Sequence, residues 1–316
     1  MSELFKLDIK NFLSFNETIF NIELSYQLYG KPIGEAPIVM VNHALTGNSS
    51  ICGKDGWWDP IVGKNKLINT EKFTVLAFNF PGNGFDEFII KNREDLILSD
   101  IAKIFKIGLD KLKIEKLHAV IGGSIGGCLI WELVVLYPSL SDNYIPIASD
   151  WKSTNWLISM TRVQKQILNN SSKPLHDARI HAMLSYRSPK SINLKFDRNI
   201  ENNKFNVENW LLYHGDKLSK RYDLDSYKLM NHLLSTVNIS DNIKFSSLAP
   251  KINSNIYIVS IDSDLLFTHE ENKITFDEIS KYKKNVFLKT IMSDHGHDAF
   301  LIEFEKINDL LHEVFI

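Results

Sequence analysis

Gly122-Gly123-Ser124-Ile125-Gly126-Gly127 is the stretch that decides the fold of this chain. The apolar run Leu117–Ile121 before it predicts a buried parallel strand, and Cys128–Leu133 after it predicts a helix. Gly-x-Ser-x-Gly between a strand and a helix is the pattern of the nucleophile elbow, a turn so tight that the neighbours of the serine must lack bulky side chains. The turn would lift the Ser124 hydroxyl above the sheet and direct the Ile125 backbone N–H at an oxyanion formed there. The alternative is a glycine-rich turn whose serine only caps the helix.

Length and composition favour one α/β unit with an insertion, because 316 residues of which 44% are hydrophobic can bury a sizeable core. The net charge is −2 without a block of like charge, so we expect neither a nucleic acid nor a membrane as a partner. Cys52 and Cys128 are too few for a disulfide framework, and the N-terminus lacks an apolar signal core. These features predict a soluble, cytoplasmic protein. No Cys/His cluster has metal-ligand spacing, so we expect no metal and no bound cofactor.

Apolar runs suited to buried strands alternate with helical segments, which predicts a mostly parallel sheet flanked by helices. The predicted helices cover about Ser99–Leu112, Gly126–Leu136 and Ile302–Val314. Catalytic loops in such sheets follow the carboxyl ends of the strands. The predicted strands cover Ile22–Tyr29, Ile38–Asn42, Phe73–Asn79, Leu117–Gly122, Asn143–Ala148, Ile256–Ile261 and Val286–Thr290.

One region, residues 151–245, breaks this alternation, because it shows helical periodicity and no good buried strand. With roughly 95 residues it is far longer than an ordinary connection. We therefore predict a helical lid at 151–245, inserted into an α/β core formed by 1–150 and 246–316. One helix face of the lid is expected to consist of Ile158, Val163, Ile167 and Leu168.

The partners that a nucleophilic serine needs are both present in the C-terminal third of the chain. A serine at its free pKa is a poor nucleophile, so a histidine must take its proton, and an acid must orient that histidine. Asp264 follows the predicted strand Ile256–Ile261, and His297 follows the last predicted strand. Nucleophile, acid, histidine is the chain order of hydrolases of this architecture. We predict a catalytic triad of Ser124, His297 and Asp264.

Each partner of Ser124 has a competitor of the same type nearby. Asp264 is preferred to Asp262 because it lies deeper in the loop and precedes an apolar anchor. His297 is preferred to His295 because Gly296 allows a sharp turn directly before it.

A second oxyanion donor is expected from the loop after the predicted strand Ile38–Asn42. The backbone N–H of Leu45 is the candidate, beside that of Ile125, and each such donor is typically worth about a hundred- to a thousandfold in rate. His43 in the same loop is expected to make a structural hydrogen bond rather than to act in catalysis.

Five stretches together resemble the homoserine O-acyltransferases of the α/β-hydrolase superfamily, chiefly homoserine O-acetyltransferase, over about Ile22 to Leu301. The resemblance implies an α/β-hydrolase fold with an inserted lid and a ping-pong reaction. Ser124 would take an acetyl group from acetyl-CoA, a co-substrate, and the hydroxyl of homoserine would accept it, as in methionine biosynthesis. The resemblance also implies that the protein is a homodimer. The stretches are His43–Gly47, Gly56–Asp59, Gly122–Gly127, Ser263–Phe267 and Gly296–Leu301.

The stretch from Arg221 to Tyr227 resembles the lid motif of that family, usually Arg-Phe-Asp-x-x-Ser-Tyr. By position, Arg221 and Tyr227 would hold the homoserine carboxylate, and Asp298 would hold its ammonium group. Two departures from the family pattern, the shorter loop Pro81–Gly84 and Lys165 in place of the usual Arg, leave the acyl donor open between acetyl-CoA and succinyl-CoA.

Two other classes of function remain open from the sequence. An esterase or thioesterase would use the same triad with water as the acceptor. A non-catalytic binding protein of the same fold typically lacks one triad member, and this chain lacks none.

Overall fold

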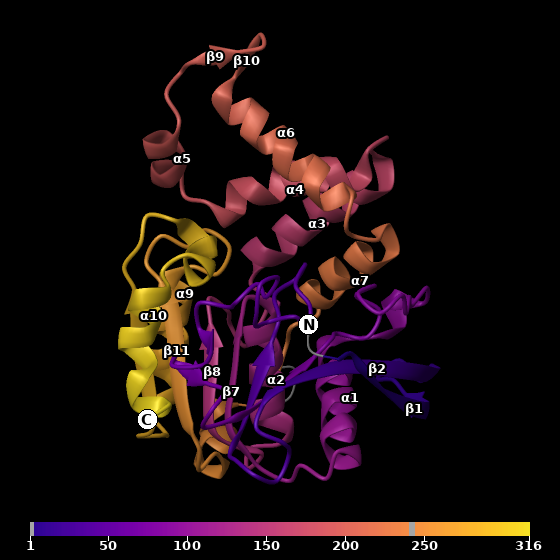
Figure 1. Cartoon of the computed structure of the whole chain (residues 1–316), viewed down its shortest axis with the longest axis vertical. Helices are drawn as coiled ribbons and strands as arrows, with labels where there is room; N and C mark the ends of the chain where they lie inside the picture. Colours follow the sequence, from indigo (N-terminus) through magenta and orange to yellow (C-terminus); the bar gives the residue numbers. More distant parts are fainter. Residues whose placement is uncertain (1–2, 240–243) are drawn as a thin grey trace.

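The computed structural model describes residues 3–239 and 244–316, and residues 1–2 and 240–243 of the predicted core and lid lie outside these ranges. An eight-stranded sheet in the order β1-β2-β6-β3-β7-β8-β11-β12 forms its centre (Figure 1). The strands are β1 (Phe5–Leu13), β2 (Ile19–Gly30), β3 (Ile38–Asn42), β6 (Thr74–Phe78), β7 (Leu117–Gly123), β8 (Ser141–Ile147), β11 (Asn255–Ile261) and β12 (Val286–Ile291). The short pairs β4 (Val62–Gly63) with β5 (Ile68–Asn69), and β9 (Ile200–Glu201) with β10 (Lys204–Phe205), lie outside it.

The sheet is mostly parallel, as the sequence predicts. The six strands from β6 to β12 run parallel, β2 pairs antiparallel with β6, and β1 pairs antiparallel with β2. The sequence analysis did not predict the edge strand β1, because β1 has no continuous apolar run. Phe5, Leu7 and Ile9 alternate there with charged residues, the pattern of a strand with one wet face.

Both faces of the sheet are apolar, because helices cover each of them. Along β3, Met40 contributes to one core cluster and Val39 to the cluster on the opposite side. The first cluster receives α1 (Leu98–Lys111), α2 (Ile125–Leu136) and α9 (His269–Ile279). The second receives α10 (Phe304–Leu311), followed by η4 (His312–Val314). In the described ranges, no helix has the length and apolar character needed to cross a bilayer.

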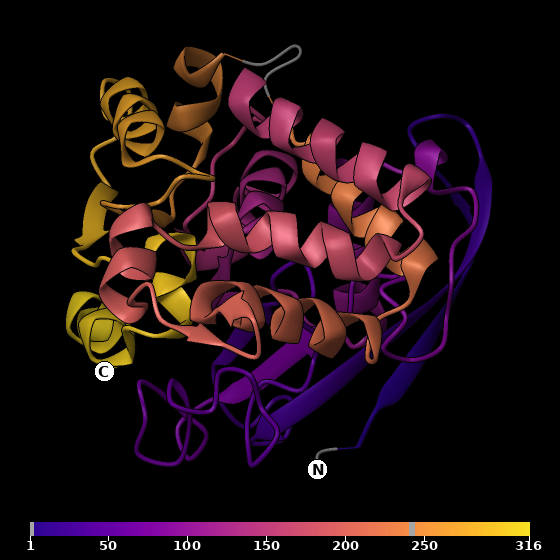
Figure 2. The ribbon, with the colours of Figure 1, turned by 90° about the horizontal axis from the view of Figure 1, so that it is seen from above.

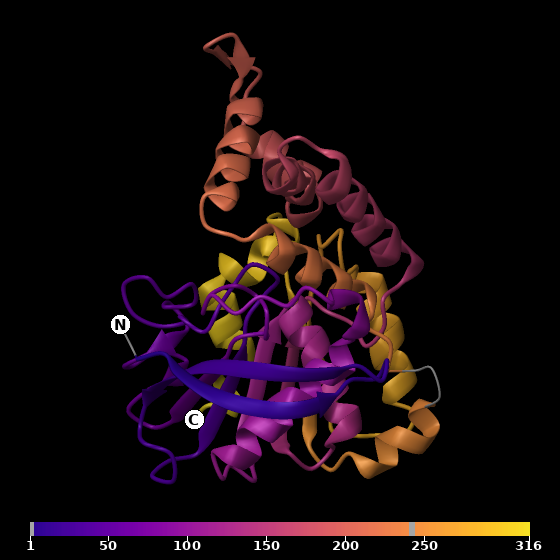
Figure 3. The same cartoon turned by 90° about the vertical axis from the view of Figure 1, so that its right-hand side faces the viewer.

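A helical insertion, α3 to α7, follows β8 and stands above the carboxyl ends of the strands (Figures 1 and 3). Seen from above, α4 lies between α3 and α6 (Figure 2). A short helix, α8 (Phe245–Leu248), and η2 (Ala249–Lys251) precede β11. The helices of the insertion are α3 (Asn155–Asn170), α4 (Pro174–Tyr186), α5 (Pro189–Lys195), α6 (Asn206–Ser219) and α7 (Leu224–Ser235).

The helical periodicity predicted for α3 is present, but only half of the predicted face packs inward: Leu168 is buried and Ile167 packs against the core, whereas the other two residues are exposed. Ile158 and Val163 are each 44% exposed. The buried side of α3 carries polar residues whose side chains have partners: Thr161 donates to the Ile158 carbonyl, and Gln164 donates to the Ala178 carbonyl. Apolar spacing could not show this, because the partners belong partly to α4. The buried residues are Leu157, Thr161, Gln164 and Leu168.

Candidate active site

Ser124 occupies a sharp turn between β7 and α2. Its backbone angles are φ 58° and ψ −129°, in the left-handed half of conformational space that non-glycine residues rarely adopt. Backbone hydrogen bonds hold the turn on both sides of Ser124. The Ser124 N–H donates to the Ile147 carbonyl (3.0 Å), and the Ser124 carbonyl accepts from Gly127 (2.9 Å) and Cys128 (3.0 Å). The predicted elbow therefore has the backbone strain and support that exposing a nucleophile requires.

Two glycines bring separate loops against this turn. A Cβ atom at Gly126 would lie 2.7 Å from the carbonyl oxygens of Asn42 and His43, and one at Gly123 would lie 2.4 Å from the ring of Phe300. Real Cβ atoms do not approach other atoms so closely. Glycine at these positions thus allows the loop after β3 and the loop after β12 to approach Ser124.

Asp264 and His297 form a buried pair. Their carboxylate Oδ2 and ring Nδ1 atoms are 2.7 Å apart, and the side chains are 0% and 3% exposed. The other carboxylate oxygen accepts from the backbone N–H groups of Leu266 and Phe267, which orients it. Desolvation lowers the pKa of His297, but the charge and hydrogen bond of Asp264, with the charge of Asp298, outweigh it and raise that pKa above its usual value.

His297 and Ser124 share a neighbour but no hydrogen bond. The His297 ring packs edge-on against Phe300, whose ring also contacts Gly123, and lies near Tyr186 and Phe267. Its second ring nitrogen, Nε2, is buried and has no hydrogen-bond partner among the described residues. Bonds from nucleophile to base are often long in ligand-free enzymes and shorten when substrate binds.

The competing acid and histidine are occupied elsewhere. Asp262 accepts from the Ser293 N–H (2.8 Å), and His295 faces Arg187 (3.3 Å). The structure thus places Asp264, not Asp262, beside His297. In the part of the chain that is described, no group of three or more His, Cys, Asp or Glu side chains could hold a metal ion.

The two predicted oxyanion donors come from the elbow and from the loop after β3. Ile125 is the first residue of α2, so its N–H has no partner one turn earlier in the helix. Leu45 lies in the loop after β3, and its carbonyl accepts from the Tyr222 hydroxyl at 3.0 Å. Across residues 3–239 and 244–316, neither N–H donates a hydrogen bond.

His43 supports the loop after β3 through hydrogen bonds of both ring nitrogens. Its Nδ1 lies 2.8 Å from the Ala44 carbonyl, and its Nε2 accepts from the Phe80 N–H and faces the side-chain amide of Asn83. Burial lowers the pKa of His43 to about 4, so the ring stays neutral at physiological pH. These contacts match the structural hydrogen bond expected from the sequence. Asn83 belongs to the shortened loop Pro81–Gly84, which therefore braces the Leu45 loop.

The three residues predicted to bind substrate lie near this centre but differ in setting. Arg221 donates to the carbonyl and hydroxyl oxygens of Thr46 at 3.0 and 3.3 Å. Tyr227 is buried, and this burial raises its pKa well above the usual value, so its hydroxyl stays protonated. Asp298 is 18% exposed and lies 3.9 Å from Arg187.

Three further residues at the centre were missed by sequence reasoning: Arg179, Tyr186 and Arg187. Tyr186 lies 5.7 Å from the His297 ring, and Arg179 stacks over Tyr186 at 5.3 Å. Arg179 and Tyr186 lie seven positions apart on α4 and so on one helix face, which was a usable signal, whereas Arg187 directly follows the end of the helix. Which face meets the active centre depends on how α4 packs against the core.

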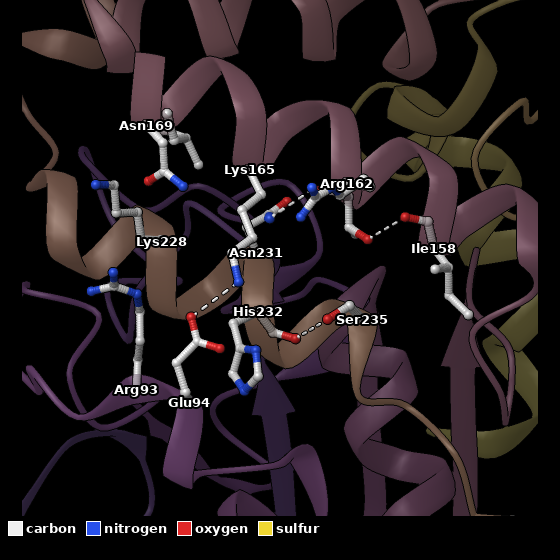
Figure 4. A pocket seen from close by; sticks show the side chains of 12 residues that line it. Arg93, Glu94, Ile158, Arg162, Lys165, Asn169, Lys228, Asn231, His232 and Ser235 are labelled. Carbon is white, nitrogen blue, oxygen red and sulfur yellow. Dashed lines mark hydrogen bonds and ion pairs between the residues drawn. The ribbon is translucent and has the colours of Figure 1, made fainter. Parts of the chain in front are cut away.

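Lys165, the second departure from the family pattern, lies in a separate pocket of about 160 Å³ between α3, α7 and the short helix η1 (Arg93–Asp95). Figure 4 shows its ion pair with Glu94, at 3.1 Å, and the neighbouring cations of the pocket. Arg162 is one of these cations. Neither Ser124 nor His297 lines this pocket.

Comparisons with known proteins agree with this architecture. Residues 37–304 match the family model described as alpha/beta hydrolase fold. The homoserine O-acetyltransferase of Methanococcus vannielii is 30% identical over 95% of this chain and 70% of that protein. That of Chloroherpeton thalassium is 30% identical over 95% of this chain and 85% of that protein. The solved structure of esterase E22 superposes with a TM-score of 0.88 at 17% identity, covering 100% of both chains, which shows a common fold.

The sheet, the elbow and the matching model define an alpha/beta hydrolase, as the sequence predicts. Within that class the chain belongs to the homoserine O-acetyltransferase family, a family of enzymes, which confirms the resemblance seen in its motifs.

Proposed function

We propose that this enzyme transfers an acetyl group from acetyl-CoA to the hydroxyl of L-homoserine through an acyl-serine intermediate. The observation that carries the proposal is the buried Asp264–His297 pair, 2.7 Å apart, packed with Phe300 against the strained Ser124 turn. The names of the curated relatives, which align with 95% of the chain, support the choice of substrates. The product would serve methionine biosynthesis. Free thiols at Cys52 and Cys128 fit a cytoplasmic enzyme.

In the first half-reaction, the Ser124 hydroxyl attacks the thioester carbonyl while His297 Nε2 takes its proton. The backbone N–H groups of Leu45 and Ile125 stabilise the oxyanion. When the tetrahedral intermediate collapses, the C–S bond breaks and His297 returns the proton to the departing CoA sulfur. Asp264 stabilises the imidazolium throughout.

In the second half-reaction, the homoserine hydroxyl attacks the acyl-serine ester. His297 takes the hydroxyl proton and then gives it to Ser124 Oγ as the ester bond breaks, which restores the enzyme. Arg221 and Tyr227 bind the carboxylate of homoserine and Asp298 binds its ammonium group, because a zwitterion needs a cation and an anion at fixed separation. Burial keeps Tyr227 protonated and able to donate.

The decisive experiment measures CoA release from acetyl-CoA with and without L-homoserine, and the mass of the intact protein after brief exposure to acetyl-CoA. We expect an acetyl adduct on the peptide that contains Ser124, its disappearance on adding homoserine, and faster CoA release with homoserine. Ser124→Ala is the control that should carry no adduct. CoA release at one rate in both conditions would contradict transfer and favour the esterase or thioesterase alternative.

The same assay with succinyl-CoA decides the acyl donor. We propose acetyl because both curated relatives are named acetyltransferases. Faster turnover with succinyl-CoA than with acetyl-CoA would overturn that choice and leave the homoserine acyltransferase proposal standing. An enzyme that forms no adduct with either donor would support a non-catalytic binding protein.

A further inference from the structure

The pocket between α3, α7 and η1 is lined by four cationic side chains in a volume of about 160 Å³. Three separate elements present them (Figure 4): η1 presents Arg93, α7 presents Lys228, and α3 presents Arg162 and Lys165. Among the described residues that line the pocket, Glu94 alone carries a carboxylate. With four positive charges against one negative, the lining has a formal charge of +3.

Two of the four cations have an acidic partner, and two have none. Lys165 lies 3.1 Å from a carboxylate oxygen of Glu94, and Arg93 lies 3.3 Å from Asp225, which stands outside the pocket. Within residues 3–239 and 244–316, neither Arg162 nor Lys228 has a carboxylate oxygen within 4.0 Å. These two unpaired charges come from facing helices, so the protein leaves the pocket positive.

His232 on α7 reports the electrostatic field inside the pocket. Desolvation is the largest influence on the pKa of His232 and lowers it, and the carboxylate of Glu94 and the bond to the Leu96 carbonyl offset this only in part. The charges of Lys165 and Arg93 lower this pKa further. The ring is therefore neutral at physiological pH, and Nε2 donates to the Leu96 carbonyl at 3.0 Å. A pocket that disfavours one more positive charge stabilises a negative one.

Uncharged polar side chains complete the lining of the pocket. Asn231 is buried, and its amide donates to the Thr161 carbonyl at 3.1 Å, which fixes one wall between α7 and α3. Asn169 adds an exposed side-chain amide at the rim. A cavity of about 160 Å³ has room for several water molecules of about 30 Å³ each, and so for one small polyatomic anion.

We propose that this pocket is a binding site for a phosphate group. A phosphate monoester carries nearly two negative charges and has three acceptor oxygens, so it can accept from Arg162 and Lys228 together while the two existing ion pairs remain. Arginine matches phosphate with two parallel N–H donors, and lysine binds it as a point charge. Neither Ser124 nor His297 lines the pocket, and the inference does not depend on the proposed function.

The test titrates inorganic phosphate into the full-length protein by calorimetry, at an ionic strength held constant with NaCl. Two double variants remove the same charge: Arg162→Gln with Lys228→Gln in the pocket, and, as the matched control, Lys204→Gln with Lys251→Gln, two exposed lysines outside it. Melting temperature with phosphate, against chloride alone, gives a second readout, because a ligand of the folded state stabilises it.

We expect saturable binding of phosphate by the wild type and by the control variant, and a rise in melting temperature in both. The pocket variant should bind phosphate at least tenfold more weakly, since hydrogen bonds to a charged group are lost, and Arg162→Lys should lose less. Absence of saturable binding, or equal weakening in the two double variants, would overturn the site. Neither result involves acyl transfer, so the proposed function would stand.

Competition by CoA and by dephospho-CoA, which lacks the 3′-phosphate monoester, identifies the source of the phosphate group. Displacement of bound phosphate by CoA but not by dephospho-CoA would assign the pocket to the monoester of that larger molecule. Binding of phosphate that neither compound reduces would assign the pocket to free phosphate. Both results support a phosphate site, and displacement by CoA that persists in the pocket variant would contradict it.

Discussion

Ser124 is a single residue held in an energetically costly backbone conformation. A non-glycine residue in a rarely populated backbone region costs of order 1–3 kcal/mol. The cost is offset by hydrogen bonds to β8 and within α2, and by glycines that admit neighbouring loops. The same turn begins α2 at Ile125, whose N–H donates no hydrogen bond within the described ranges.

The orientation of His297 depends on one carboxylate, so Asp264→Asn should lower kcat by about ten-thousandfold, since an amide favours the wrong imidazole tautomer. Melting temperature should change little, because Asn retains the oxygen that accepts from Leu266. Steady-state CoA release measures the effect. Asp262→Asn is the matched control and should keep most activity, and a similar loss in both variants would argue that the acid was misassigned.

The pKa of His297 predicts a pH dependence of acyl-enzyme formation. His297 must be neutral to accept a proton, and its pKa is raised above the usual value of about 6.5, so the rate should rise with pH through an apparent pKa above that value. Asp298→Asn removes one of the two carboxylates that raise this pKa, and should move the apparent pKa downward.

The measurement is the burst of CoA release without acceptor, which avoids any role of Asp298 in binding homoserine. Asp294→Asn is the control, because that carboxylate is paired with Lys190 and partly exposed, and it should leave the profile in place. An apparent pKa that does not move in Asp298→Asn would show that the charge of Asp298 does not reach the base.

At the scale of elements, α2 carries more than the elbow. Two turns beyond Ser124 its buried face includes Glu132, which accepts from the Ser99 hydroxyl, while Glu132 Oε1 has no hydrogen-bond partner within the described ranges. Desolvation raises the pKa of Glu132 to about 7. The folded protein therefore keeps a proton on this carboxyl that the unfolded chain releases at lower pH.

A raised carboxyl pKa stabilises the fold at low pH, and this stabilisation is lost as the pH rises from about 4.5 through about 7. Glu132→Gln lacks this dependence. Its free energy of unfolding, relative to wild type, should increase by about 2 kcal/mol between pH 5 and pH 8. Urea unfolding at both pH values provides the measurement, with the exposed Glu305→Gln as control. A difference independent of pH would show that Glu132 is ionised in the folded state.

The elements that could be predicted from sequence are those with a strong local pattern. Strand β3 has the predicted bounds, Ile38–Asn42, because a run buried on both faces is apolar throughout. Helix α9 has no such pattern. Its sequence is mostly polar and only Asn272, Thr275 and Ile279 are buried, so its place against the sheet comes from tertiary packing and a cap at Thr268.

At the scale of the whole molecule, the insertion presents apolar side chains to solvent. Trp156 and Val163 on α3 are 52% and 44% exposed, and Leu184 on the neighbouring helix α4 is 53% exposed. Exposed apolar side chains on neighbouring helices mark a candidate interaction surface, here the outer faces of α3 and α4. We propose that this surface forms the homodimer expected from the family resemblance.

Sedimentation velocity tests that assembly. The wild type should sediment as a dimer, and Val163→Glu with Leu184→Glu should sediment as a monomer, since burying two carboxylates without partners disfavours association. Ile200→Glu, at the start of strand β9 in the β9–β10 hairpin, is the control that should remain dimeric. A monomeric wild type, or a dimer that persists in the double variant, would exclude this surface.

The sequence by itself determined the fold class and the elbow, and it singled out Asp264 and His297, which the structure pairs, because tight turns and buried strands restrict residue types locally. Tertiary structure alone decided which face of α3 is buried and that Arg179 stacks over the Tyr186 ring. Those features depend on how helices pack across the insertion, and the partner of each side chain lies far away along the chain. Local constraints on residue type can be inferred from a sequence. Contacts between side chains on different helices and strands can be assigned only from the folded structure.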